Sequence, residues 1–210
     1  MTSKNNIFKN VKRLRREFPL QERIEAADTA TCEAYATVLL AWLQNGSAPQ
    51  QDIIPAVELE KLLAIDAVVL TDAGLGCYPF SASKTGISVK YDAHTVYAMC
   101  AIDALAIPFL AASPATIHTH CSNCEEPIVV RTDETGQVKE EIPAGAQVEY
   151  RQISVQHSAC CNDLCPGITF VCPTCVANAH LKNDLMSLEE AAVVGRAFFH
   201  FQSCLDVCLA

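Results

Sequence analysis

The stretch "VYAMCAIDALAIPFL", residues 96–110, places a single carboxylate in a segment that is otherwise apolar. An isolated carboxylate in an apolar interior is costly unless it is paired, hydrogen-bonded or protonated. Asp103 lies three residues after Cys100, so the two side chains would share one face of a helix. The pattern therefore indicates a nucleophile or metal ligand beside a proton carrier. The alternative is a small core cysteine next to an aspartate that bonds buried backbone.

The segments before this stretch predict two helices and a strand-loop-strand unit. "DTATCEAYATVLLAWLQNG" has apolar residues at helical spacing, with Asp28 or Thr29 as N-cap and Asn45-Gly46 as a stop signal. "AVELEKLLAID" predicts a shorter amphipathic helix, and "AVVLTDAGLGCYPFSASKTGISVKYD" alternates and turns like a wing. The order helix, helix, wing is typical of winged-helix domains.

The remaining segments predict one long helix, several strands and a final helix. We expect the long helix over about residues 94–110, with Asp92 as its N-cap. Strands are expected in "ATIHTHCSNCEEPIVVRT" and "GQVKEEIPAGAQVEYRQIS", and a capped helix begins at Ser187. The predicted fold class is α+β, in which an N-terminal winged-helix-like helical domain precedes a mixed α+β catalytic domain. The expected segments are a basic leader with a first helix (1–24), the winged-helix-like domain (25–91) and the catalytic domain with a Cys-rich strand and loop (92–210).

Charge is distributed unevenly along the 210 residues. The formal net charge is −9, but six of the 15 Lys and Arg residues lie in the first sixteen positions. We expect this basic start to be a frayed, solvated leader. The rest of the chain is strongly acidic, which argues against general nucleic-acid binding because phosphate contacts need clustered Lys and Arg.

The N-terminal region carries no signal-peptide pattern, and the longest apolar run is interrupted by Asp103 and Pro108. That run is shorter than the roughly 20 residues that a membrane-spanning helix needs. We therefore expect a cytoplasmic protein with no membrane partner.

Twelve cysteines are the main compositional anomaly. In a reducing compartment they favour thiolate chemistry or metal binding over disulfides, and thiolates select soft or borderline metals. Two pairs have the spacing of zinc knuckles, and a redox dithiol or an unoccupied pair are the alternatives. These pairs are Cys121-x-x-Cys124 and Cys172-x-x-Cys175. Adjacent cysteines at 160–161 and a third at 165 form a thiol-dense loop, in which at least one thiol is expected to meet a distant partner.

Five motifs, in this order and approximate spacing, resemble the alkylmercury lyases. They are "YPFSASKTGISV" (78–89), "VYAMCAIDALAIPF" (96–109), "HC" (120–121), "PAG" (143–145) and "SACC" (158–161). The resemblance runs from about Ala36 to residue 210 and is strongest between residues 78 and 110. The chain departs from the family after the cysteine pair, where a longer stretch, "NDLCPGITFVCPTC", adds three cysteines.

The resemblance implies protonolysis of carbon–mercury bonds by two cysteines and an aspartate, on a winged-helix-like domain packed against a catalytic α+β domain. By motif the three residues are Cys100, Asp103 and Cys160, and Cys121 matches a cysteine that the family uses structurally. Two thiolates would capture R–Hg⁺, and Asp103, with a pKa raised by apolar surroundings, would carry a proton to the leaving carbon.

Mercury is then substrate and product, no organic cofactor is expected, and the knuckles would hold a structural zinc. Expected partners are a small organomercurial substrate and an acceptor of Hg(II), either cellular thiols or a mercuric reductase or other thiol protein.

Two other functions fit parts of the sequence. One is a soft-metal-binding or transfer protein on the same fold, without turnover. The other is a winged-helix regulator with a zinc ribbon, which predicts a basic recognition helix, whereas "AVELEKLLAID" is acidic. The regulator also leaves Asp103 unexplained.

Overall fold

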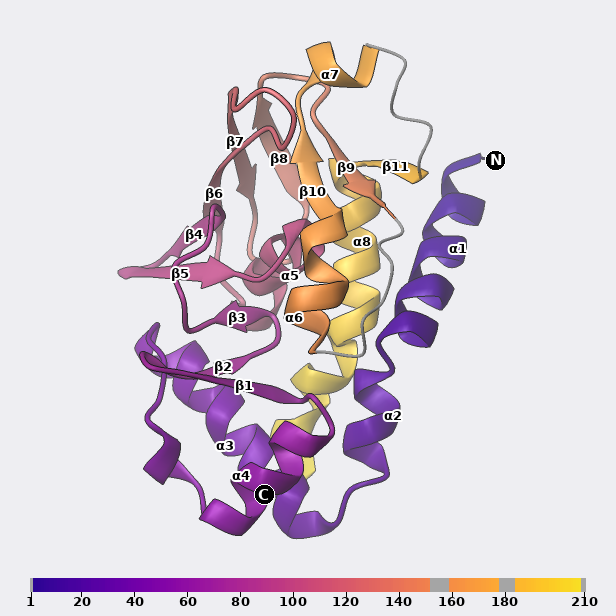
Figure 1. The fold of residues 1–210 in the computed structure, drawn as a ribbon. Coiled ribbons are helices and arrows are strands. Elements are labelled where there is room, and N and C mark those ends of the chain that lie inside the picture. Colours follow the sequence, from indigo (N-terminus) through magenta and orange to yellow (C-terminus); the bar gives the residue numbers. More distant parts are fainter. Residues whose placement is uncertain (1, 152–158, 178–183, 209–210) are drawn as a thin grey trace.

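The computed structural model describes residues 2–151, 159–177 and 184–208, which form a mixed α+β fold (Figure 1). Four helices come first, with one short 3-10 turn between the last two. They are α1 (Thr2–Glu17), α2 (Leu20–Glu25), α3 (Thr29–Asn45), η1 (Gln51–Ile53) and α4 (Ala56–Ala64). The predicted α+β class, with helices preceding an antiparallel sheet, is confirmed. The winged-helix-like assignment of the N-terminal part stays a prediction.

An antiparallel sheet follows, with strand order β1-β2-β3-β5-β4-β6-β7-β8. Its strands are β1 (Val68–Thr71), β2 (Gly74–Cys77), β3 (Phe80–Ser81), β4 (Ser88–Tyr91), β5 (His94–Ala98), β6 (Ala115–His120), β7 (Pro127–Thr132) and β8 (Val138–Ile142). A second sheet has the order β10-β9-β11. It consists of β9 (Gln147–Tyr150), β10 (Ile168–Val171) and β11 (Asp184–Ser187). The larger sheet crosses the domain boundary predicted at residue 91, so both sides of that boundary share one layer. The division into domains stays a prediction.

The caps predicted for two helices are present. Asp28 caps α3 by accepting a 2.9 Å hydrogen bond from the Thr31 N–H, and Gly46 ends the helix at φ 60°. A Cβ at Gly46 would also lie 2.4 Å from the His94 ring, so this position needs glycine for its conformation and its space. Ser187 begins α8 (Leu188–Phe199) with a capping box.

The helix predicted over residues 94–110 is wrong in its first half. Residues 94–98 form β5, and α5 covers Ala101–Ala111. Thr95, Val96 and Tyr97 are β-branched or aromatic, and they pair with β4 across a two-residue turn. Asp92, the expected N-cap, lies in that turn at φ 46°. Cys100 caps α5 instead, which places it directly at the start of the helix.

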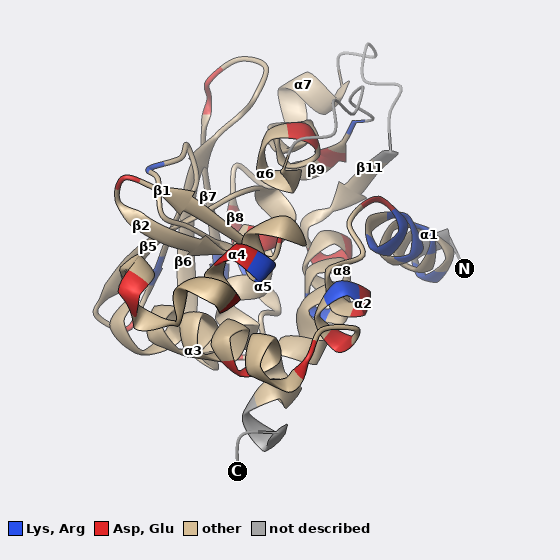
Figure 2. Ribbon diagram, turned by 60° about the horizontal axis from the view of Figure 1, so that its bottom comes forward, with Lys and Arg blue, Asp and Glu red and all other residues tan. Residues whose placement is uncertain are grey.

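The basic N-terminal segment is also different from the expected solvated leader. It forms α1, which lies along α8 (Figures 1 and 2). Leu14 and Asn10 are buried, and Arg13 stacks 3.9 Å from the Tyr150 ring centroid. Figure 2 shows Lys and Arg gathered on this helix. Its buried residues and the stacked guanidinium anchor the helix, and Arg15 adds a 2.9 Å hydrogen bond to the Ala197 carbonyl oxygen of α8.

The centre of the molecule is α5, which contacts β4, β5, β6, β10 and α8. All residues from Ala101 to Pro108 are buried. Gly195 on α8 permits close approach, because a Cβ there would lie 2.8 Å from the Ile102 carbonyl oxygen. The stretch with which the sequence analysis began is thus the core helix, and its single carboxylate lies inside the protein.

None of the helices among the described residues has both the length and the apolar character that crossing a bilayer requires.

Candidate active site and four-cysteine cluster

Cys100 and Asp103 lie together at the buried start of α5. Cys100 is the N-cap, and its Sγ accepts a 3.4 Å hydrogen bond from the Asp103 backbone N–H. The two residues are 3% and 5% exposed. The capping geometry, rather than two positions within a helix, therefore brings thiol and carboxyl to the same end of α5.

Burial raises the pKa of the Asp103 carboxyl to about 7, although hydrogen bonds with Cys100 and Cys165 oppose the shift. The Cys165 thiol donates to Asp103 Oδ2 at 3.8 Å. A carboxyl group with this pKa exchanges a proton near neutral pH, which an exposed aspartate does not do.

Cys160 approaches the same place from another part of the chain. It begins α6 (Cys160–Asp163), and Cys165 begins the 3-10 turn η2 (Cys165–Gly167). The two sulfurs are 3.9 Å apart. The ligand atoms of Cys100, Asp103 and Cys165 all lie within 4.8 Å of one another, and all three residues are buried. The three residues predicted by motif thus converge on Cys165, to which the sequence analysis gave no role.

The thiols of this group are protonated at neutral pH. Burial raises the pKa of Cys100 to about 12. Hydrogen bonds to the other two thiols, together with burial, raise the pKa of Cys165 well above its usual value. The Cys165 hydrogen bond lowers the pKa of Cys160, but burial and the charges of Asp103 and Asp66 give a net rise. A soft cation that binds here must therefore displace thiol protons.

Two residues from the N-terminal half position Cys160. Asp66 Oδ2 accepts a 2.8 Å hydrogen bond from the Cys160 backbone N–H, and the Tyr78 hydroxyl accepts one of 3.0 Å from the Cys161 N–H. Tyr78 in turn donates to Asp66 Oδ1 at 3.0 Å. Arg23 lies 3.7 Å from Asp66. No sequence pattern indicated this network, because its members are far apart along the chain.

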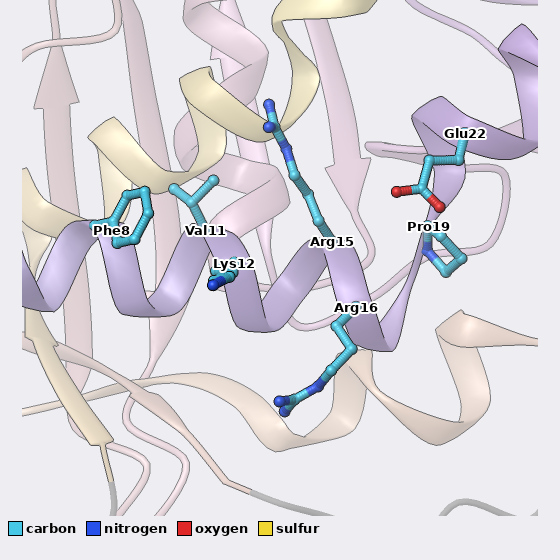
Figure 3. Close-up of a pocket in the computed structure, with 7 residues that line it drawn as sticks. All are labelled: Phe8, Val11, Lys12, Arg15, Arg16, Pro19 and Glu22. Atoms are coloured by element: carbon cyan, nitrogen blue, oxygen red, sulfur yellow. The ribbon is translucent and has the colours of Figure 1, made fainter.

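A groove of about 270 Å³ has one cysteine, Cys161, in its lining. Met99 and Cys161 line it, and these are the sequence neighbours of Cys100 and Cys160. Val69 and Ala82 contribute apolar surface from the sheet. A larger groove of about 500 Å³ on α1, shown in Figure 3, has no cysteine in its lining. The smaller groove is therefore the candidate for a site next to the thiol group.

A second cluster contains the four knuckle cysteines. The sulfurs of Cys121, Cys124, Cys172 and Cys175 all lie within 4.8 Å of one another. The Cys172 backbone N–H donates to Cys121 Sγ at 3.3 Å, and the Cys124 and Cys172 sulfurs are 3.5 Å apart. The spacing thus predicted a real association: Cys121 and Cys124 follow β6, while Cys172 and Cys175 follow β10.

The cysteines of the four-cysteine cluster differ in the direction of their pKa shifts. Burial opposes ionisation of Cys121, but several backbone N–H donors outweigh it and lower its pKa. A hydrogen bond to Cys124 raises the pKa of Cys175, and burial raises that of Cys172. Four sulfurs this close together are a set of ligands that could bind one soft metal ion.

Comparison with known proteins identifies a family and a similar solved structure. Residues 80–200 match the family profile described as "MerB: Alkylmercury lyase". The fold is similar to "Crystal structure of the mercury-bound form of MerB2", with a TM-score of 0.70, 18% identity, and coverage of 87% of this chain and 96% of that chain. No curated protein matches the chain. The family profile spans more than half of the sequence and includes the residues of the thiol group, and on this ground the chain belongs to the alkylmercury lyase family.

Proposed function

We propose that the protein is an organomercurial lyase that cleaves carbon–mercury bonds to give a hydrocarbon and Hg(II). The observation that carries this proposal is the buried group at the start of α5. There the Cys100 thiol lies against Asp103, whose pKa is about 7, and the Cys160–Cys165 segment approaches from α6. Family membership supports the same assignment.

In this proposal, the thiols of Cys100 and Cys160 bind the substrate. Sulfur is a soft ligand and mercury a soft ion, so Cys100 and Cys160 exchange their protons for R–Hg⁺. Asp66 and Tyr78 accept hydrogen bonds from the two backbone N–H groups at the start of α6. These bonds hold Cys160 in place before the substrate arrives. The organic group R occupies the groove beside Met99 and Cys161.

Asp103 supplies the proton for cleavage of the carbon–mercury bond. Two thiolates add electron density to mercury and weaken its bond to carbon, and the carbon then needs a proton. Asp103 takes a proton from an incoming thiol and delivers it to the carbon as hydrocarbon leaves. Burial makes this possible, because an aspartate of ordinary pKa holds no proton to donate at neutral pH.

The proposal is tested with the purified, thiol-protected protein and methylmercury or phenylmercury. Methane or benzene should be released with turnover and measured by gas chromatography. Heat-denatured protein, which keeps all twelve thiols, is the control for uncatalysed thiol chemistry. Mercury retention without hydrocarbon would instead support the soft-metal-binding alternative. Cellular thiols, or a mercuric reductase or other thiol protein, are the proposed acceptors of the Hg(II) product.

The regulator alternative has little support in the distribution of charge. Helix α4 carries Glu58, Glu60 and Lys61, so it lacks the basic face that phosphate contacts require. Basic residues gather on α1 instead, where the helix packs along α8 (Figure 2).

We further propose that the four-cysteine cluster holds a structural zinc. It would join the end of β6 to the end of β10 and so tie the two sheets together. About one zinc per chain is expected by elemental analysis. It should be lost, with a fall in melting temperature, when Cys172 and Cys175 are both changed to Ser, because thiolate ligation of zinc contributes directly to folding.

Cys204→Ser is the matched control for the zinc measurement, since Cys204 is exposed and belongs to neither cluster. This variant should keep its zinc and its melting temperature. An equal zinc content in the double variant would contradict the assignment.

A further inference from the structure

Cys165 has surroundings that differ from those of an ordinary core cysteine. A buried free cysteine usually packs as a small apolar side chain. Cys165 is 4% exposed, yet its sulfur lies 3.9 Å from Cys160 Sγ and 3.8 Å from Asp103 Oδ2. It is also within 4.8 Å of Cys100 Sγ. Its sulfur is thus close to both proposed mercury ligands and to the proposed proton donor.

We propose that Cys165 is a third sulfur ligand for Hg(II) at this site, so that the ion produced by cleavage is held by Cys100, Cys160 and Cys165. This inference rests on the proposed function for its place in the reaction, but the site itself does not require turnover. It accounts for a thiol that neither the two-thiolate capture step nor the four-cysteine cluster uses.

The separation of the Cys160 and Cys165 sulfurs is that of two neighbouring ligands in a three-coordinate site. With metal–sulfur bonds of about 2.3 Å or slightly more, a linear pair needs sulfurs about 4.6 Å or more apart, whereas the corners of a planar triangle lie about 4 Å apart. The observed separation of 3.9 Å between Cys160 and Cys165 is that of a triangle edge. Thiolates are the ligands that a soft ion prefers, so a third sulfur at this distance is chemically matched.

Formation of the mercury–sulfur bond to Cys165 also accounts for the proton of that thiol. After Asp103 has protonated the departing carbon, its carboxylate faces the Cys165 S–H group at 3.8 Å. Forming the Hg–S bond to Cys165 breaks that S–H bond, and the proton passes to Asp103. No electrons are transferred, and the negative charge moves from the carboxylate to the three-thiolate complex. Release of Hg(II) to two external thiols supplies two protons, and Asp103 returns its proton as the third, so all three protein thiols are restored and Asp103 is again a carboxylate.

The test uses inorganic Hg(II) and X-ray absorption spectroscopy at the mercury edge, so it does not depend on hydrocarbon release. Zinc-loaded full-length protein receives one equivalent of Hg(II) as a small-thiol complex, and zinc content is measured after desalting. We expect three sulfur neighbours around mercury with zinc retained. Cys165→Ala should lower the number to two, and Cys165→Ser provides a second variant if the first folds poorly.

Cys204→Ala is the matched control, because Cys204 is an exposed cysteine that belongs to neither cysteine cluster. It should keep three sulfur neighbours. Two neighbours in the parent protein, or three in both Cys165 variants, would overturn the proposal. Displacement of zinc by the first equivalent would overturn it as well, because mercury would then prefer the four-cysteine cluster. Three neighbours without hydrocarbon release would leave this site standing and remove only the lyase assignment.

Discussion

Asp103→Asn is expected to capture phenylmercury as the parent protein does but to release benzene about 100-fold or more slowly, the usual scale for a lost general acid. The amide keeps the size of the side chain and leaves Cys100 and Cys160 in place. It cannot exchange a proton at neutral pH as the carboxyl group does, whose pKa is raised by burial to about 7. Mercury bound per chain and benzene released are measured in the same single-turnover reaction.

Asp92→Asn is the matched control for this substitution. Asp92 is exposed in the β4–β5 turn at φ 46°, a left-handed conformation that asparagine tolerates. It should leave both capture and release unchanged. Benzene release by Asp103→Asn at the parent rate would show that Asp103 is a buried structural acid, and the proton-transfer mechanism would be abandoned.

Removal of the thiols of Cys160 and Cys165 should weaken the capture of organomercurial, whereas Asp103→Asn should slow only the release of hydrocarbon. Cys160→Ser is expected to weaken retention of organomercurial against competing thiols by more than the roughly 10- to 100-fold that loss of an outer-shell partner costs. The double variant Cys160→Ser/Cys165→Ser should lose retention almost completely. Cys100 would then be the one sulfur left in the group, and a single thiolate bond exchanges readily with small thiols. Mercury retained after dialysis against a thiol is the measurement.

Cys204→Ser is the control for these variants, because Cys204 is exposed and belongs to neither cysteine cluster. It should retain mercury like the parent. Equal retention by the double variant would mean that mercury binds elsewhere, and the assignment of Cys160 as a ligand would be wrong.

Local patterns in the sequence predicted local features of the fold. The Asp28 and Ser187 caps are simple short-range signals, and both are present. The long helix was misplaced because Val96 to Ala98 are apolar enough for either a buried helix or a buried strand. Pairing with β4 decided in favour of the strand, so Cys100 became a helix cap.

The sequence by itself determined the α+β class, the adjacency of Cys100 and Asp103, and the two Cys-x-x-Cys knuckles, because each depends on spacing within one or two turns of chain. The resemblance to the lyases added Cys160. The position of Cys165 between two thiols and a carboxyl, and the hold of Asp66 and Tyr78 on the start of α6, were decided by the tertiary structure. Side-chain direction repeats with the period of a helix or strand and so can be read locally. Contacts between distant segments depend on how α5, α6 and the sheets pack. The periodicity of residues within one segment gives no information about this packing.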